Sequence, residues 1–273
     1  MKKIIVPTDF SSAAKNALDY AINLAKSYQA EIYLLNAYSM PHSGSAVMID
    51  VSDVLKKDST GKLDEESARV ENSLDGLTLK TFSQNGSVAM VISQVAEHIN
   101  ADLIVMGTTG ATGLKEVFIG SNTADLIKGT KLPIIAVPAE SSNKTIAKVA
   151  VSVDLHHLEA ASVFDPLKDI LEANKASLKM INIADNMKSI DPVNFVDEAV
   201  DIDNMFFGIE HSFKFLEGKD IEEEILAYTK DENIDLLVVV TRKRNFFERL
   251  FHKSMSKKLT MHSSVPIMIL SDG

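Results

Sequence analysis

The chain contains one pattern of strand-like segments twice, and this repeat limits the folds that it can adopt. The segments "KKIIVPTDF", "AEIYLLNAY", "ADLIVMGTT" and "KLPIIAVPA" return in the same order as "AKVAVSVDL", "ASLKMINIA", "IDLLVVVTR" and "SVPIMILSD". The first two pairs lie 145 and 146 residues apart, and the last two lie 133 residues apart. The second copy is therefore shorter between its second and third strands. The matched residues are Asp9 and Asp154, Asn36 and Asn182, Asp102 and Asp235, and Pro133 and Pro266.

Two copies are too few for a solenoid, which stacks many short units, so the repeat predicts a tandem pair of domains. The length of 273 residues is sufficient for two hydrophobic cores. The polar stretch "AESSNKT", residues 139–145, is the predicted linker. We therefore place the two domains at residues 1–142 and 143–273.

Apolar strands alternate with amphipathic helical patterns in the first copy. The predicted strands are "KIIVP", "EIYLLNA", "LKTFS", "DLIVMG" and "PIIAVP", and three of them are continuous apolar runs, as is typical of a buried parallel sheet. Ser11 or Ser12 is placed to cap the first helix. The alternation predicts an α/β fold of two tandem, open, parallel five-stranded sheets flanked by helices. The helical stripes consist of Ala14, Ala17, Leu18, Ala21, Ile22 and Ala25, and of Val88, Val91, Ile92, Val95, Ala96 and Ile99.

The charge and the lack of cysteine exclude several classes of partner and chemistry. A net charge of −10 opposes binding to nucleic acid or to an anionic membrane. No apolar run reaches the length of a membrane span or of a signal-peptide core. The absence of cysteine excludes disulfides, thiolate chemistry and cysteine-based zinc sites, and it fits a reducing compartment. We expect a cytoplasmic protein that binds neither nucleic acid nor a membrane.

A glycine-rich stretch, "GTTGATGLKEVFIGSNT" at residues 107–123, follows the apolar run "ADLIVM". In an open parallel sheet, ligands bind beyond the carboxyl ends of the strands, where the strand order reverses. Asp9 follows the first strand and Gly107 follows the fourth, so the two residues would line one crevice if those strands are neighbours. Glycine lets backbone N–H groups approach a phosphate closely, and a helix start favours an anion. The alternative is a turn without a ligand, and the residues alone leave both open.

Residues 107–121 fit the pattern G-x2-G-x9-G-[ST] through Gly107, Gly110, Gly120 and Ser121. Together with the opening "IIVPTDFS", this pattern resembles that of the ATP-binding branch of the universal stress protein family, and the resemblance covers the whole chain as two tandem domains. It implies ATP as the ligand, with Mg²⁺ compatible as a bridge between the phosphates. It also implies that the final strands of the two halves pair, which would make the chain an internal pseudo-dimer. A homodimer of the tandem chain is left open.

The resemblance also implies which residues form the site. Pro7, Thr8 and Asp9 would line the base and ribose. Ala37 would offer its backbone to the base, and Met106 would close that part of the site. The sequence contains no carboxylate cluster that would predict a metal site built by the protein. No residue is assigned a catalytic role. The residues implied for ribose and phosphates are Gly107, Gly110, Gly120, Ser121, Asn122 and Thr123.

The second copy departs from the glycine pattern. At the offset of 133, Gly107 becomes Val240, Gly110 becomes Lys243 and Gly120 becomes Lys253. Side chains then stand where backbone would have to approach phosphate, so only the first half is predicted to bind ATP. The basic stretch "RKRNFFERLFHK" in the second copy is interpreted as a solvated loop, in preference to a site for another anion or an acidic partner.

Three functions remain at this stage. The favoured hypothesis is an ATP-binding regulator or sensor of stress responses that acts on an unknown protein partner. The second is a slow ATPase or a phosphoryl- or adenylyl-transfer enzyme. No general base and cationic clamp are evident at the transferred phosphoryl group, so any hydrolysis is expected to be weak. The third is a dimerisation scaffold that binds another small ligand.

Overall fold

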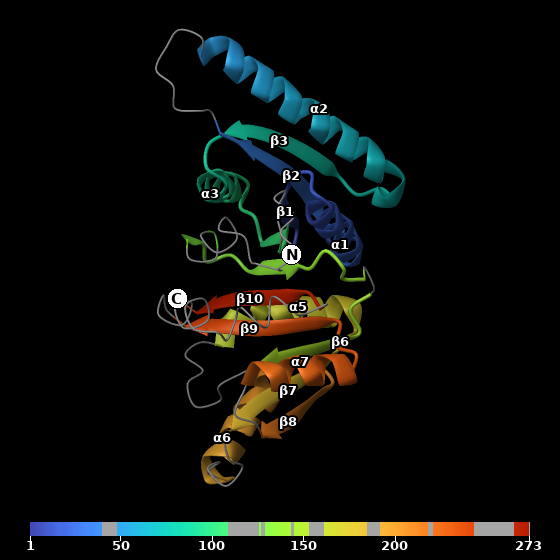
Figure 1. The fold of residues 1–273 in the computed structure, drawn as a ribbon. Coiled ribbons are helices and arrows are strands. Elements are labelled where there is room, and N and C mark those ends of the chain that lie inside the picture. The colour runs from blue at the N-terminus through green and yellow to red at the C-terminus, as the bar shows by residue number, and fades with distance from the viewer. Residues whose placement is uncertain are drawn as a thin grey trace. The chain divides into compact units, whose positions relative to one another are not determined.

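The computed structural model describes residues 1–39, 48–108, 126, 129–142, 145–152, 161–184, 192–217, 221–242 and 265–272. The chain divides into two compact units, Met1–Asn143 and Lys144–Gly273. Both units are built on the same α/β plan, which Figure 1 shows from the blue N-terminus to the red C-terminus. Among the described residues, no helix combines the length and apolarity needed to cross a membrane.

The first unit alternates strands and helices as the sequence predicts, and the five predicted strands are confirmed. α1 and α3 coincide with the two predicted apolar stripes, and Figure 1 shows these helices on opposite sides of β1. The elements are β1 (Lys3–Pro7), α1 (Ser12–Tyr28), β2 (Glu31–Tyr38), α2 (Met48–Leu74), β3 (Leu79–Asn85), α3 (Val88–Ile99), β4 (Leu103–Gly107) and β5 (Ile134–Val137).

All strands of the first unit run parallel, in the order β3-β2-β1-β4-β5. β1 lies in the centre, with Ile4 opposite both Ile32 of β2 and Leu103 of β4. These three side chains are fully buried, because helices cover both faces of the sheet. The parallel α/β fold predicted from the continuous apolar runs is confirmed.

The second unit repeats this topology, with the strand order β10-β9-β6-β7-β8. α6 has 14 residues where α2 has 27. The difference of 13 equals the fall in the repeat offset from 146 to 133, so the shortening of the second copy lies in this helix. The elements are β6 (Lys148–Ser152), η2 (Ala161–Phe164), α5 (Asp165–Asn174), β7 (Ser177–Ala184), α6 (Pro192–Met205), β8 (His211–Glu217), α7 (Ile221–Asp231), β9 (Leu236–Arg242) and β10 (Ile267–Asp272).

A carboxylate fastens the start of the first strand in both units. In the first unit, Asp102 Oδ2 accepts hydrogen bonds from the backbone N–H groups of Lys2 and Lys3 at 2.7 and 2.9 Å. In the second unit, Asp235 Oδ2 accepts from the backbone N–H groups of residues 147 and 148, both at 2.9 Å. The repeat of Asp102 as Asp235 is therefore explained by a shared structural contact at the amino ends of the strands.

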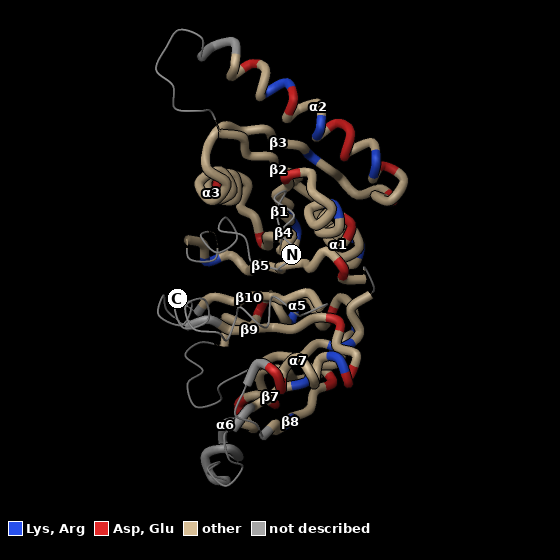
Figure 2. The backbone as a smooth tube through the Cα atoms, in the orientation of Figure 1, with Lys and Arg blue, Asp and Glu red and all other residues tan. Residues whose placement is uncertain are grey.

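α2 is a long helix that no apolar stripe in the sequence marks. The described part of the helix has four deeply buried residues, and two of them, Ser59 and Glu66, are polar. Figure 2 shows acidic and basic positions interspersed along the rest of α2. The strand–helix alternation predicts a helix in this region, but the mixed buried face hides its periodicity.

Tyr33 illustrates how a polar contact stabilises the amino ends of β2 and β3. Its hydroxyl donates to Glu31 Oε2, which also accepts from Lys80 Nζ at 3.0 Å. The hydrogen bond to Glu31, followed by burial, raises the pKa of Tyr33. Because the folded-state pKa is the higher one, this contribution to stability is present below the unfolded-state pKa and is lost as the pH rises through the folded-state pKa.

We expect Glu31→Gln to lower the pKa of Tyr33 toward its ordinary value, because the carboxylate that favours the protonated hydroxyl is removed. Lys80→Gln is expected to shift that pKa in the opposite direction, since the Lys80 ammonium favours the phenolate. Alkaline titration of the phenolate absorbance, compared between each variant and the wild type, measures both shifts. Identical titration curves for Glu31→Gln and the wild type would contradict this account.

Candidate functional site

The strand order of the first unit reverses between β1 and β4. The chain moves from β1 to β2 and β3 on one side, and then to β4 and β5 on the other. β1 and β4 pair in parallel, so their carboxyl ends, at Pro7 and Gly107, lie at the same edge of the sheet. The condition on which Asp9 and Gly107 would line one crevice, that these strands are neighbours, is met. This reversal is the position where open parallel sheets bind ligands.

Three adjacent strands bring the described candidate residues to this edge. Pro7, Thr8 and Asp9 follow through the end of β1, Ala37 lies near the end of β2, and Met106 and Gly107 end β4. Met106 and Thr8 are buried, whereas Asp9 is exposed. The structure therefore collects these six candidates at neighbouring strand ends. The remaining candidates, Gly110, Gly120, Ser121, Asn122 and Thr123, lie outside the described residues.

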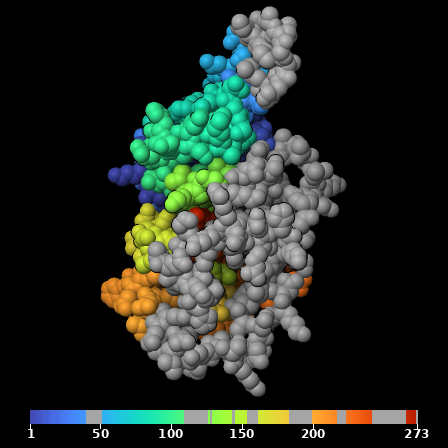
Figure 3. Space-filling model, turned by 90° about the vertical axis from the view of Figure 1, so that its left-hand side faces the viewer, coloured from blue at the N-terminus to red at the C-terminus, as the bar shows by residue number. Residues whose placement is uncertain are grey.

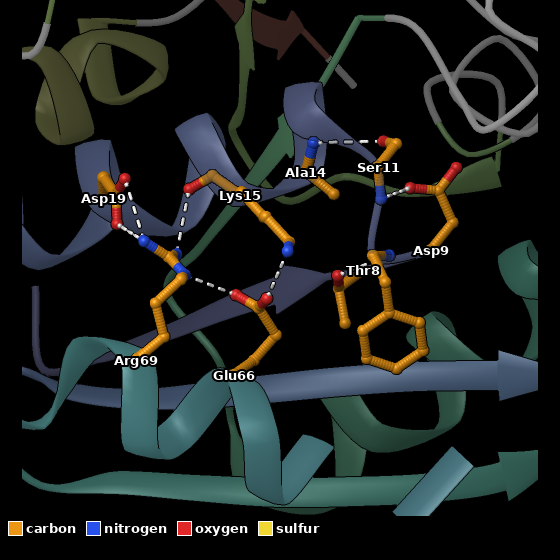
Figure 4. Close-up of polar contacts among 9 residues, drawn as sticks. Thr8, Asp9, Ser11, Ala14, Lys15, Asp19, Glu66 and Arg69 are labelled. Carbon is orange, nitrogen blue, oxygen red and sulfur yellow. Dashed lines mark hydrogen bonds and ion pairs between the residues drawn. The ribbon is translucent and has the colours of Figure 1, made fainter. Parts of the chain in front are cut away.

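The turn from β1 into α1 is held by its own polar side chains, as Figure 4 shows. Thr8 Oγ1 accepts from the backbone N–H of Phe10 at 3.0 Å, and Asp9 Oδ1 accepts from that of Ser11 at 3.0 Å. Phe10 has a φ of 65°, in the left-handed region that a bulky side chain rarely adopts. The turn is thus a defined conformation that the surrounding contacts maintain.

Ser11 caps α1, as one of the two predicted alternatives. Its side chain accepts from the backbone N–H of Ala14 at 3.3 Å. The first turn of α1 carries no acidic residue, so the positive end of the helix dipole is not neutralised from within the helix. Such an N-terminus, directed to the edge where β1 ends, favours an anionic group of a ligand.

Gly107 is needed for close packing between β4 and α1. A Cβ atom at this position would lie 2.9 Å from the carbonyl carbon of Ala13 and 3.0 Å from its carbonyl oxygen. Real side chains do not approach backbone this closely, so the strand and the first turn of α1 meet through the missing side chain. The resemblance implies a contact of Gly107 with the ligand, and the structure adds this packing role.

Thr108 is a candidate that the sequence analysis does not name. It follows β4 directly, and its backbone N–H donates to the carbonyl of Val137 at 3.1 Å. The residue is 2% exposed, and Oγ1 has no hydrogen-bond partner within the part of the chain that the structure describes. Burying a hydroxyl without a partner is costly, so Thr108 could donate to or accept from a group bound at this edge. The letters "GTTG" do not distinguish this threonine from its neighbour.

A buried polar network lies behind the turn. Asn36 Nδ2 donates to the carbonyl of Thr8 at 2.7 Å, and Asn36 Oδ1 accepts from Ser59 Oγ at 2.7 Å. Ser83 Oγ lies 2.6 Å from Ser59 Oγ. Since Ser59 gives its proton to Asn36, Ser83 donates to Ser59. β1, β2, β3 and α2 are joined in this way directly behind a candidate residue.

An ionic cluster connects α1 with α2 further along the helices (Figure 4). Glu66 is 5% exposed and pairs with Lys15 at 2.9 Å and with Arg69 at 2.7 Å. Arg69 also pairs with Asp19 at 2.9 Å. Burial opposes the charge of Arg69, but the hydrogen bonds to Glu66 and Asp19 outweigh it and raise the pKa of the guanidinium. The cluster holds α2 against α1.

In the second unit, β9 contains a described counterpart of the site. Val240 takes the place of Gly107, is partly buried and lies opposite Leu270 of β10. The counterparts of Asp9, Gly110 and Gly120 lie outside the described residues. The described residues of the chain contain no group of three or more His, Asp or Glu side chains that could hold a metal ion.

Sheets with this strand order and helices on both faces define the Rossmann-like class of α/β proteins, and each unit has this architecture. The sequence model described as the universal stress protein family matches residues 1–138 and 205–271. The chain belongs to the universal stress protein family. The unmatched stretch between these ranges includes the linker and the first part of the second copy.

Individual relatives agree with this assignment. A universal stress protein of Methanocaldococcus jannaschii is 36% identical over 142 residues, which are 50% of this chain and 81% of the relative. One of Synechocystis is 31% identical over 137 residues, 50% of this chain and 85% of the relative. The crystal structure of a universal stress protein from Archaeoglobus fulgidus covers 99% of this chain and 98% of its own, with a TM-score of 0.78 and 20% identity. That structure shows that the fold of the whole chain has a solved counterpart.

Proposed function

We propose that the first domain, residues 1–142, binds ATP and that the chain acts as an ATP-binding regulator or sensor in a stress response. The observation that carries the proposal is the buried Thr108 hydroxyl at the strand-order reversal, where Gly107 packs the end of β4 against the first turn of α1. A helix N-terminus and a buried hydroxyl that has no partner among the described residues are complementary to the ribose and phosphates of a nucleotide. The glycine pattern at residues 107–121 supports the same ligand.

The proposed contacts follow the order of the strands. Pro7, Thr8, Asp9, Ala37 and Met106 face the nucleoside, and Mg²⁺ is a bridging ion supplied with ATP. The residues that hold ribose and phosphates are Gly107, Gly110, Gly120, Ser121, Asn122 and Thr123. The second domain, residues 143–273, is a universal stress domain that lacks this route to ATP. The internal pseudo-dimer of the two halves and an unidentified protein partner remain parts of the proposal.

The contacts of two charged residues near the site, Asp9 and Lys15, favour regulation over catalysis. Asp9 Oδ1 is engaged with the backbone N–H of Ser11. Lys15, in the first turn of α1, directs its ammonium to Glu66 at 2.9 Å. Phosphoryl transfer requires a group that orients the nucleophile and a cation at the transferred phosphoryl group. Neither role is supported for these two residues, so we propose little or no hydrolysis, with a slow ATPase as the alternative.

The proposal predicts that freshly purified protein contains a single adenine nucleotide per chain. The protein is denatured, and the released small molecules are identified and quantified by mass spectrometry. Gly110→Lys, which copies the second unit, is expected to lose the nucleotide, because a long side chain then occupies the path of the phosphates. Gly129→Lys serves as the matched control, since an added Cβ at that exposed position meets nothing within 4 Å.

The nucleotide that is released separates the alternatives. Intact ATP supports a regulator or sensor, and mainly ADP supports slow hydrolysis. A chain that carries no nucleotide and acquires none when ATP is added would overturn the ATP proposal and favour the dimerisation scaffold. Equal nucleotide contents in Gly110→Lys and Gly129→Lys would show that the glycine stretch is not the binding route.

A further inference from the structure

α2 contacts the rest of the first unit through an unusually polar face. Its deeply buried residues are Ser59, Leu63, Glu66 and Val70, which recur at helical spacing. Two apolar side chains contribute to the packing without directional requirements. The two polar side chains, in contrast, are satisfied only when the helix sits in one position, because an unpaired buried polar group is costly.

The polar residues of α2 meet the segment that runs from the end of β1 into α1. Ser59 reaches Thr8 through Asn36. One turn later, Lys62 Nζ lies 5.9 Å from the centre of the Phe10 ring, within range of a cation–π contact.

The contacts continue along both helices in the same order. Glu66 pairs with Lys15, and Arg69 pairs with Asp19 (Figure 4). α2 therefore follows the β1–α1 segment from the candidate site outward along α1.

The first two of these contacts hold the part of the turn that is least favourable by itself. Phe10 adopts a left-handed φ of 65°, and the bond from its N–H to Thr8 Oγ1 depends on the placement of Thr8. Asn36 fixes the Thr8 carbonyl, and Ser59 orients the Asn36 amide by donating to its oxygen. A conformation of this kind persists only where its surroundings enforce it.

We propose that α2 forms part of the nucleotide site as a positioning element: Ser59, acting through Asn36, and Lys62, acting on Phe10, hold the β1–α1 turn in the conformation that binds ATP. This inference rests on the proposed function of the first unit. Since the ligand then binds the chain with α2 docked more tightly than the chain with α2 displaced, ATP must in turn favour docking of α2. Binding of the nucleotide at the strand ends thereby changes how firmly α2 is docked on the outside of the unit.

The test compares Ser59→Ala with Thr60→Ala in the full chain. Thr60 is the matched control, because its hydroxyl is exposed and bonds only within α2, to the carbonyl of Lys56 at 2.9 Å. ATP affinity is measured by calorimetry after bound nucleotide is removed, and hydrogen exchange of α2 amides is measured with and without ATP. We expect Ser59→Ala to weaken ATP binding by about tenfold, because the loss of one buried hydrogen bond changes a binding constant by about that factor. Thr60→Ala is expected to leave the affinity unchanged.

Further readouts separate positioning from structural support. ATP is expected to slow the exchange of α2 amides in the wild type and in Thr60→Ala, and to slow it less in Ser59→Ala. Lys62→Met, which keeps the aliphatic stem, is expected to weaken ATP binding about threefold. If Ser59→Ala loosens α2 without ATP but binds ATP as the wild type does, the positioning role is overturned while the ATP proposal stands. If the wild type binds no ATP, the proposed function itself fails, and the role of α2 at that site fails with it.

Discussion

Gly107→Ala is expected to destabilise the first unit by about 1–3 kcal/mol and to weaken ATP binding. The added methyl group would lie 2.9 Å from the carbonyl carbon of Ala13, an atom of the α1 backbone that cannot rotate away. α1 would have to move off β4 and displace the Thr8–Ser11 turn with it. Urea unfolding followed by circular dichroism measures the stability, and calorimetry measures the affinity for ATP.

Gly61→Ala is the control for this prediction. Gly61 lies inside α2, and a Cβ there meets nothing within 4 Å. Replacing a helical glycine by alanine ordinarily stabilises a helix by about 0.5–1 kcal/mol. The same chemical change is therefore expected to have opposite effects at the two positions. Unchanged unfolding of Gly107→Ala would show that β4 and α1 can separate at little cost, contrary to the packing role assigned to Gly107.

Phe206→Ala is expected to cost the second unit about 3–5 kcal/mol, which is the range for removing a buried phenylalanine. Phe206 is fully buried directly after α6, and its ring stands edge-on to that of Phe164, with the centroids 5.8 Å apart. Because Phe164 is also fully buried, the truncation leaves a cavity in the centre of the core. Hydrogen exchange of the β6, β7 and β8 amides is expected to accelerate, since these strands pack in that unit.

The adjacent phenylalanine provides the comparison. Phe207 is 89% exposed, so Phe207→Ala is expected to change the free energy of unfolding by no more than about 0.5 kcal/mol. The two variants have the same composition and differ by a single position in the chain. Similar exchange rates in Phe206→Ala and Phe207→Ala would contradict the burial that distinguishes them.

The sheets could be predicted because their strands carry the signal of double-sided burial. "IIV" in β1 and "IIAV" in β5 are wholly buried, and such continuous apolar runs indicate parallel strands that are buried on both faces. The cap of α1 was also within reach, since serine before an apolar stripe is a strong start signal and Ser11 fulfils it. The neighbouring position of β1 and β4 was only a condition at the level of the sequence, because no local pattern reports strand order, and the structure provides it.

α2 could not be located from its periodicity, because Ser59 and Glu66 replace apolar residues on its buried face. Their burial depends on partners far away in the sequence, Asn36 and Lys15, and no local pattern reports such contacts. The same limit applies to Thr108, whose buried hydroxyl is evident only from the tertiary structure. The pattern offered a ligand contact or a turn as the reason for Gly107, whereas the structure provides packing against Ala13.

The outer face of the first unit adds a practical consequence for partner studies. In Figure 3, the green surface of β3 and α3 is exposed on the side that faces the viewer. Met90 of α3 is 47% exposed. α2, by contrast, presents alternating charges (Figure 2). Solvent-facing positions on these two helices can therefore be labelled with a spectroscopic probe without removing core side chains.

The carboxylate contacts of Asp102 and Asp235 lie at the amino ends of the central strands, whereas the candidate site lies at the carboxyl ends. Both copies secure the beginning of their central strand through two consecutive backbone N–H groups. Both also add a lysine bond to a carbonyl at or just after the end of a helix, from Lys3 to Ile99 and from Lys148 to Glu232. Each domain is thus anchored at the edge opposite the candidate site. Because both copies keep this anchor, the residues at the candidate-site edge can differ between them, as Gly107 and its counterpart Val240 do, while the strand order stays the same.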